Sequence, residues 1–152
     1  MARLVLNLPE HCLFATDLPI GIGQINYGGH LGNDSALTLL HEARLRLFAS
    51  LGFNEREIHG CSLIQTDACL IYKGEAFWGD TLRAELMVDD FNKYGFDVFY
   101  RLWRLSDGKD ILHAKTGLIF INIETRRPAS VPPAFSAVMS MEMKKHETVR
   151  TE

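Results

Sequence analysis

Residues 33–51 read NDSALTLLHEARLRLFASL, and this stretch decides the fold. Asn33 and Asp34 are good helix N-cap residues, and Gly52, directly after the stretch, is a typical helix stop. Apolar residues recur at the three- and four-residue spacing of one helix face, at Ala36, Leu37, Leu40, Ala43, Leu47, Phe48 and Leu51. Because Leu39 is also apolar and lies outside this stripe, apolar surface covers much of the circumference. We therefore expect the rest of the chain to enclose the helix.

The segments on either side of this helix have the character of strands. Residues 13–27 predict an irregular edge strand that ends in a glycine-containing turn at residues 26–29. Asp107-Gly108 is a hairpin signal between two of the later strands. After the helix, β-branched and apolar residues predict strands at 63–72, 81–90, 96–105 and 111–123. We therefore expect an α+β fold in which a curved antiparallel sheet wraps one long central helix.

Length and composition place this sheet and helix in one domain. The chain has 152 residues, and its 16 Lys and Arg against 19 Asp and Glu give a formal net charge of −3. We expect a single domain over residues 1–152, with a core at about 12–133 and a C-terminal tail at about 134–152. Within the tail, residues 134–145 predict a short amphipathic helix, which is followed by a polar, frayed end.

The same composition argues against several classes of protein. A slightly acidic chain has no general electrostatic attraction to nucleic acid or anionic lipid, and no apolar run is long enough to span a membrane. The N-terminus carries no readable secretory signal, so we expect a cytoplasmic protein. Cys12, Cys61 and Cys69 form no metal-binding or disulfide pattern, and we expect neither a metal nor a cofactor. A sheet that wraps one helix leaves its other face uncovered, which predicts a homodimer or homotetramer.

Two motifs lie one before and one within the helix: Asn26-Tyr27-Gly28-Gly29-His30-Leu31-Gly32-Asn33 leads into it, and Glu42-Ala43-Arg44 lies along it. They resemble the hotdog-fold acyl-CoA thioesterases, most closely the branch around 4-hydroxybenzoyl-CoA thioesterase. That branch has a D-x-x-G-H-[VL]-x-N turn, followed by a central helix that contains E-A-R. Tyr72, residues 77–80 and residues 125–128 also match later strands of the family, so the resemblance covers about residues 12–133. It implies a hotdog fold and hydrolysis of an acyl-CoA thioester without a cofactor.

The turn departs from the family pattern at one position that matters for chemistry. Asn26 occupies the place of that branch's active-site aspartate, and an amide is neither a general base nor a carboxylate nucleophile at neutral pH. Other branches of the family take the carboxylate from the central helix and use an Asn or Gln near this turn to orient water or the carbonyl. The resemblance therefore implies that Asp34 supplies the carboxylate and that Asn26 orients water or substrate.

Each of these residues also has a structural explanation. Asp34 is an ordinary N-cap, worth about 1 kcal/mol of helix stability, and Asn26 is a common turn residue. His30 could hold the turn through its imidazole or act as a general base near neutral pH. Gly28 and Gly29 leave room for substrate beside the unpaired N–H groups at the start of the helix. The N–H groups of the helix start, together with the turn at residues 28–30, are predicted to polarise a thioester carbonyl.

Further residues complete the predicted site. Glu42 lies two turns from Asp34, about 12 Å along the helix, and is the second candidate for the carboxylate unless it merely pairs with Arg46 on the surface. Asp67, on the strand after the helix, is a third candidate for the carboxylate. Both Asp67 and Tyr27, in the turn, are predicted to contact substrate. Two other functions stay open: a non-catalytic acyl-CoA-binding protein, and an enoyl thioester hydratase or dehydratase that pairs a histidine with a carboxylate.

Overall fold

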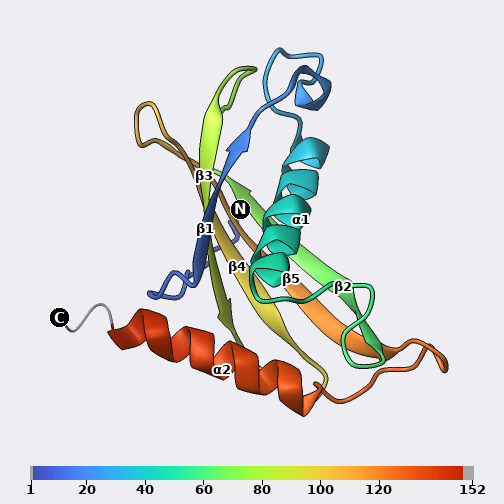
Figure 1. The fold of residues 1–152 in the computed structure, drawn as a ribbon. Helices are drawn as coiled ribbons and strands as arrows, with labels where there is room; N and C mark the ends of the chain where they lie inside the picture. Colours follow the sequence, from blue (N-terminus) through green and yellow to red (C-terminus); the bar gives the residue numbers. More distant parts are fainter. Residues whose placement is uncertain (1, 149–152) are drawn as a thin grey trace.

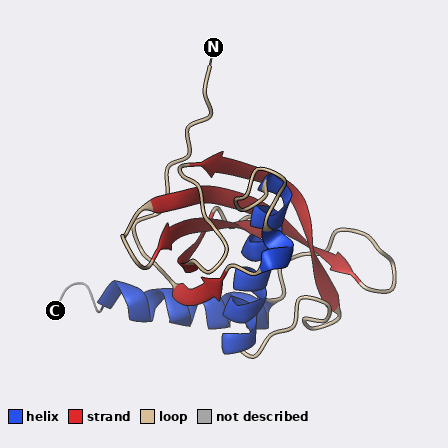
Figure 2. Cartoon of the chain, turned by 90° about the horizontal axis from the view of Figure 1, so that it is seen from above, coloured by secondary structure: helices blue, strands red, loops and turns tan. Residues whose placement is uncertain are grey.

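The computed structural model describes residues 2–148. It contains one curved antiparallel sheet of five strands in the order β1-β3-β4-β5-β2. Along the chain the elements are β1 (Phe14–Pro19), the 3-10 helix η1 (Ile22–Gln24), α1 (Asn33–Ser50), β2 (Cys61–Tyr72), β3 (Thr81–Asp89), β4 (Gly95–Arg104), β5 (Asp110–Asn122) and α2 (Pro133–Thr148). Figures 1 and 2 show the sheet curving around α1, which confirms the predicted α+β hotdog architecture. Within the described residues, no helix is long and apolar enough to cross a membrane.

Helix α1 starts and packs slightly differently from the prediction. Its N-cap is Gly32, so the predicted N-caps Asn33 and Asp34 are wrong; both lie in the first turn, and no side chain among residues 2–148 caps this end. The side chains of α1 that are buried against the rest of the chain are Ala36, Leu39, Leu40, Ala43, Arg44, Leu47 and Phe48. Leu39, outside the predicted stripe, is buried as the expected wide cover requires, whereas Leu37, within the stripe, is exposed. Because both residues are apolar, the apolar pattern of the helix does not show which of them the sheet buries.

The C-terminal end of α1 is closed by an aromatic cluster. Helix α2 lies across this end of the sheet (Figure 1) and buries Phe135 and Met139. The ring centroid of Phe135 lies 5.0–6.1 Å from those of Phe48, Phe53, Phe96 and Phe120. Such ring contacts add to the energy of apolar burial and fix the geometry of this end. The predicted helix at 134–145 is confirmed and is longer, and the expected frayed end falls partly on residues 149–152, outside the described residues.

The face of the sheet that points away from α1 carries cross-strand ion pairs. Arg101 on β4 binds Glu85 on β3 at 2.9 Å, and Lys115 on β5 binds Asp67 on β2 at 3.3 Å. Partly exposed pairs of this kind add little stability, but they keep the face polar. The prediction of an oligomer assumed that this face is apolar and uncovered. Among the described residues the face carries these charged pairs instead, so it does not support that argument.

A buried polar network fastens α1 to β2, the edge strand on the other side of the sheet from β1. Arg44 on α1 and Glu55, in the loop between α1 and β2, are both buried and form an ion pair. Arg44 also donates to the side-chain oxygen of Gln65 on β2 at 3.0 Å, and His41 lies 3.1 Å from the second carboxylate oxygen of Glu55. Beyond β2, no other strand of the described chain completes the sheet.

Candidate functional site

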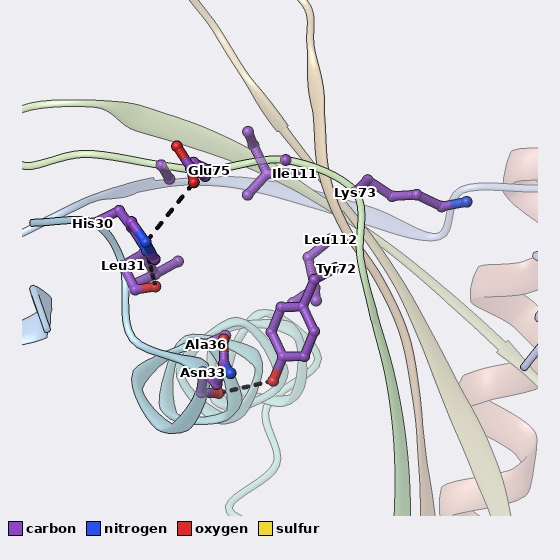
Figure 3. A pocket seen from close by; sticks show the side chains of 11 residues that line it. His30, Leu31, Asn33, Ala36, Tyr72, Lys73, Glu75, Ile111 and Leu112 are labelled. Atoms are coloured by element: carbon purple, nitrogen blue, oxygen red, sulfur yellow. Dashed lines mark hydrogen bonds and ion pairs between the residues drawn. The ribbon is translucent and has the colours of Figure 1, made fainter. Parts of the chain in front are cut away.

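A cavity of about 280 Å³ lies where α1 begins (Figure 3). Four segments line it: the loop before α1, the first turn of α1, the end of β2 with the loop that follows, and the start of β5. The lining residues are His30, Leu31, Asn33, Ala36, Tyr72, Lys73, Gly74, Glu75, Ala76, Ile111 and Leu112. Aliphatic side chains form much of the wall and a few polar groups face them, which is typical of a site for a small organic group.

The turn before α1 is organised by Asn26. Its side-chain oxygen accepts hydrogen bonds from the backbone N–H groups of Gly28 (3.0 Å) and His30 (3.4 Å). Its backbone carbonyl accepts from the N–H of Gly29 at 3.0 Å. The structural role predicted for Asn26 is therefore confirmed. The same bonds occupy the turn amides that were expected to polarise a carbonyl, so that task passes to the helix.

The first turn of α1 offers the donors that the preceding turn lacks. The first helical hydrogen bond runs from the N–H of Ala36 to the carbonyl of Gly32. The N–H groups of Asn33, Asp34 and Ser35 have no acceptor within residues 2–148. Unpaired amides at the positive end of a helix attract negative charge and suit the developing oxyanion of a tetrahedral intermediate.

Asp34 lies in the same helical turn as these donors and directly follows the cavity residue Asn33. Its carboxylate is exposed, has no ion-pair or hydrogen-bond partner within residues 2–148, and borders a shallow hollow with Leu37, Thr38 and His41. An ideal Cβ on Gly32 would come within 2.7 Å of Oδ1 of Asp34, so a residue with a side chain at position 32 would displace this carboxylate. The reading of Asp34 as a helix cap does not hold.

Tyr72 connects Asp34 to the cavity. The Tyr72 side chain lines the cavity, and its hydroxyl donates to the backbone carbonyl of Asn33 at 3.1 Å. Burial and the negative charge of Asp34 both raise the pKa of the Tyr72 hydroxyl, which keeps it protonated as a donor. The Asp34 carboxylate is therefore close to the rim of the cavity, although it belongs to the neighbouring hollow.

His30 points into the cavity toward a residue that the sequence did not suggest. Its Nε2 lies 3.8 Å from Oε1 of Glu75, in the loop after β2 (Figure 3). Glu75 is far from His30 along the chain, and no local motif connects the two. The one hint in the sequence is position: Glu75 follows the predicted strand end Tyr72 by three residues, where a charged side chain can reach a site at the end of the sheet.

The other predicted site residues lie away from the cavity. Glu42 pairs with Arg46 at 2.8 Å, and Arg46 also donates to the β1 backbone, which confirms the surface pair predicted for Glu42. Asp67 faces the outer side of the sheet, where it binds Lys115. Tyr27 is fully exposed at the tip of the turn. The structure thus brings together Asn26, the glycine turn, His30 and the start of α1, but not these three residues.

The fold and this cavity define a hotdog protein, and comparison with known families agrees. A family model described as the thioesterase-like superfamily matches residues 20–139. Because the match covers most of the chain, the chain belongs to the thioesterase-like superfamily. A search of curated protein sequences found no match.

Three solved structures illustrate the shared fold. A 1,4-dihydroxy-2-naphthoyl-CoA thioesterase from Synechocystis has a TM-score of 0.77 at 18% identity, covering 84% of this chain and 95% of its own. A DHNA-CoA thioesterase from Staphylococcus aureus gives 0.76 at 20% identity, with 84% and 88% covered. A hypothetical protein from Staphylococcus aureus in complex with CoA gives 0.79 at 22% identity, with 91% and 89% covered. At these identities the likeness concerns the fold.

Proposed function

We propose that this protein hydrolyses an acyl-CoA thioester to a free acid and CoA. One observation carries the proposal: Asp34 and three unpaired helix N–H groups share the first turn of α1, close to the rim of a mainly aliphatic cavity. Thioester hydrolysis needs a nucleophile, donors for the oxyanion and an enclosure for the acyl group, and this end of the molecule offers all three. Membership of the thioesterase-like superfamily and the similarity of fold to CoA thioesterases support it.

In the proposed reaction the acyl group occupies the cavity, and its carbonyl oxygen accepts from the N–H groups of Asn33, Asp34 and Ser35. The positive end of the helix stabilises the charged carboxylate of Asp34, which favours attack as a nucleophile over removal of a proton. The Asp34 oxygen bonds to the thioester carbon, the C–S bond breaks, and CoA leaves as a thiolate. Asn26 keeps its side-chain N–H groups, which have no acceptor within residues 2–148, for orienting substrate or water.

We also propose that the protein acts as a homo-oligomer, a dimer or a tetramer, through the edge of β2. This strand is paired on one side by β5, and Ile64 on it is exposed together with Leu37 and Leu45 on α1. An uncovered edge flanked by apolar side chains favours pairing with a second copy. The measured mass of the protein in solution tests this: a monomer at micromolar concentration would contradict it.

The function is tested by thiol release from a panel of short-chain, long-chain and aromatic acyl-CoAs. We expect the wild type to turn over at least one of them, and Asp34→Asn to lower that rate by about 100-fold or more, the size of effect typical of a lost catalytic group. The matched control is Asp90→Asn. Asp90 is exposed and has a φ of 56°, a conformation that Asn tolerates, so this variant keeps the wild-type rate.

The possible outcomes separate the candidate functions. Equal rates for the wild type and a folded Asp34→Asn would remove the Asp34 role and leave Glu42 and Asp67 as the predicted carboxylates. Tight acyl-CoA binding without turnover would indicate a binding protein. Hydration of a 2-enoyl-CoA without thiol release would indicate a hydratase.

A further inference from the structure

A pair of titratable groups lines the cavity, and the chemistry proposed for Asp34 does not use it. His30 and Glu75 face each other from two loops, with Nε2 and Oε1 3.8 Å apart and side chains 33% and 66% exposed (Figure 3). Both line the cavity proposed for the acyl group. A histidine and a carboxylate at a substrate cavity are a common arrangement for moving a proton.

The backbone under both side chains is held in place. The N–H of Leu31, next to His30, donates to the carbonyl of Ala76, next to Glu75, at 2.7 Å. The buried guanidinium of Arg104 donates to the carbonyl of Glu75 at 3.0 Å. The two loops are therefore bonded to each other and to β4, and the separation of the pair is a property of the fold rather than of one free side chain.

One ring nitrogen of His30 lies near a backbone acceptor. Nδ1 of His30 lies 3.5 Å from the backbone carbonyl of Leu31, and a carbonyl can only accept. The carbonyl of Leu31 can accept a proton carried on Nδ1, and this neutral tautomer leaves Nε2 as an acceptor facing Glu75. Gly28 leaves space for this arrangement, because an ideal Cβ there would lie 3.3 Å from Nε2.

Two acceptors that face each other at this distance cannot bond directly, but they can share a donor. A separation of 3.8 Å exceeds the range of a hydrogen bond, and a water molecule carries two O–H groups, one for each acceptor. We propose that His30 and Glu75 activate the water that completes hydrolysis. His30 acts as the general base through Nε2, while Glu75 holds the second hydrogen of the water and stabilises the imidazolium that forms.

This role rests on the proposed function and supplies its second half. Once CoA has left, the acyl group is bound to Asp34 as a mixed anhydride. The water oxygen bonds to the acyl carbon while Nε2 of His30 takes one proton from the water. The bond between the acyl carbon and the Asp34 oxygen then breaks, Asp34 is restored as a carboxylate, and the free acid departs. His30 returns its proton to the CoA thiolate or to solvent.

The test compares water with a nucleophile that needs no activation. Glu75→Gln and His30→Gln are assayed in the full chain with an acyl-CoA that the wild type hydrolyses, with and without hydroxylamine. We expect acid formation to fall about 100-fold or more, as when a general base is lost. Hydroxamate formation should stay within about threefold of the wild type, because neutral hydroxylamine attacks the acyl group without a base. Without hydroxylamine, each variant should release about one equivalent of CoA per site in a burst and then slow.

The control is Glu124→Gln, the same change at an exposed site in the loop after β5, which should match the wild type in both assays. Wild-type acid formation by Glu75→Gln would overturn the pairing while leaving the thioesterase proposal intact. An equal loss of acid and hydroxamate in a folded variant would also overturn it, because the pair would then act on acyl transfer and not on water. If Glu75→Gln does not fold, His30→Gln decides by the same comparison. Absence of thiol release by the wild type with every acyl-CoA would instead refute the proposed function.

Discussion

Two of the histidine–glutamate pairs among the described residues, His30–Glu75 and His41–Glu55, differ in what surrounds them. His30 and Glu75 join two loops at the wall of the cavity, with nitrogen and oxygen 3.8 Å apart. His41 and Glu55 lie closer, at 3.1 Å, and the side chain of Glu55 is 9% exposed. The other oxygen of Glu55 binds the buried guanidinium of Arg44. The residue types are the same, but in the second pair both carboxylate oxygens are already used.

The difference shows what separates a structural pair from one that is available for chemistry: whether both carboxylate oxygens already have partners, which is here called saturation. Both oxygens of Glu55 are occupied, and removing Arg44 would leave its buried charge without a counter-ion. Glu75 is mostly exposed and meets His30 at a distance that leaves room for a third group. We therefore expect changes at Arg44, His41 and Glu55 to act on stability, and changes at His30 and Glu75 to act on turnover.

The largest expected effect is on stability, at Arg44, and the contrast fails if this effect is absent. Replacing Arg44 by Leu leaves Glu55 buried without its counter-ion and Gln65 without its donor. We expect the free energy of unfolding, measured by urea denaturation, to fall by about 3–5 kcal/mol, the usual cost of breaking a buried ion pair from one side. Arg46→Leu on the same helix is the control, since Arg46 forms a half-exposed pair with Glu42 and should cost about 1 kcal/mol or less.

A double variant sharpens the same test. Arg44→Leu combined with Glu55→Leu removes both charges, so much of the lost stability should return, because no unpaired carboxylate stays buried. The free energy of unfolding of the double variant could instead fall below that of Arg44→Leu. In that case the network contributes through its hydrogen bonds and not through charge compensation.

The fold was largely predictable because its signals are local. Runs of β-branched and apolar residues predicted all four later strands, and Gly52, with a φ of 82°, does follow the end of α1. Arg44 was missed as a core residue, although Leu40 and Leu47 lie next to it on the helix surface. Its charge argues for exposure, and its partner Glu55 lies in a loop that no periodicity places.

The site was predictable in part, for the same reason. Asn26, His30 and the start of α1 are neighbours in sequence, so the turn and the helix end could be read together. Glu75 could not be assigned, because its approach to His30 depends on how β2 lies in the sheet and on a bond between two loops. The N-cap was misread because Asp34 is a common capping residue, whereas here Gly32 occupies that position.

A smaller effect is expected at His41, and comparing His41→Ala with His30→Ala tests the same contrast through the two histidines. His41→Ala removes one hydrogen bond to Glu55, while Arg44 still compensates the charge. We expect the free energy of unfolding to fall by about 1 kcal/mol, at the low end for a bond to a charged group because His41 is half exposed, and acyl-CoA hydrolysis to stay within about twofold of the wild type. His30→Ala should show the opposite: a change in stability within about 0.5 kcal/mol and a large loss of turnover. If His41→Ala slowed hydrolysis as much as His30→Ala, the saturated pair would have to take part in the chemistry. Saturation would then fail as the feature that distinguishes the two pairs.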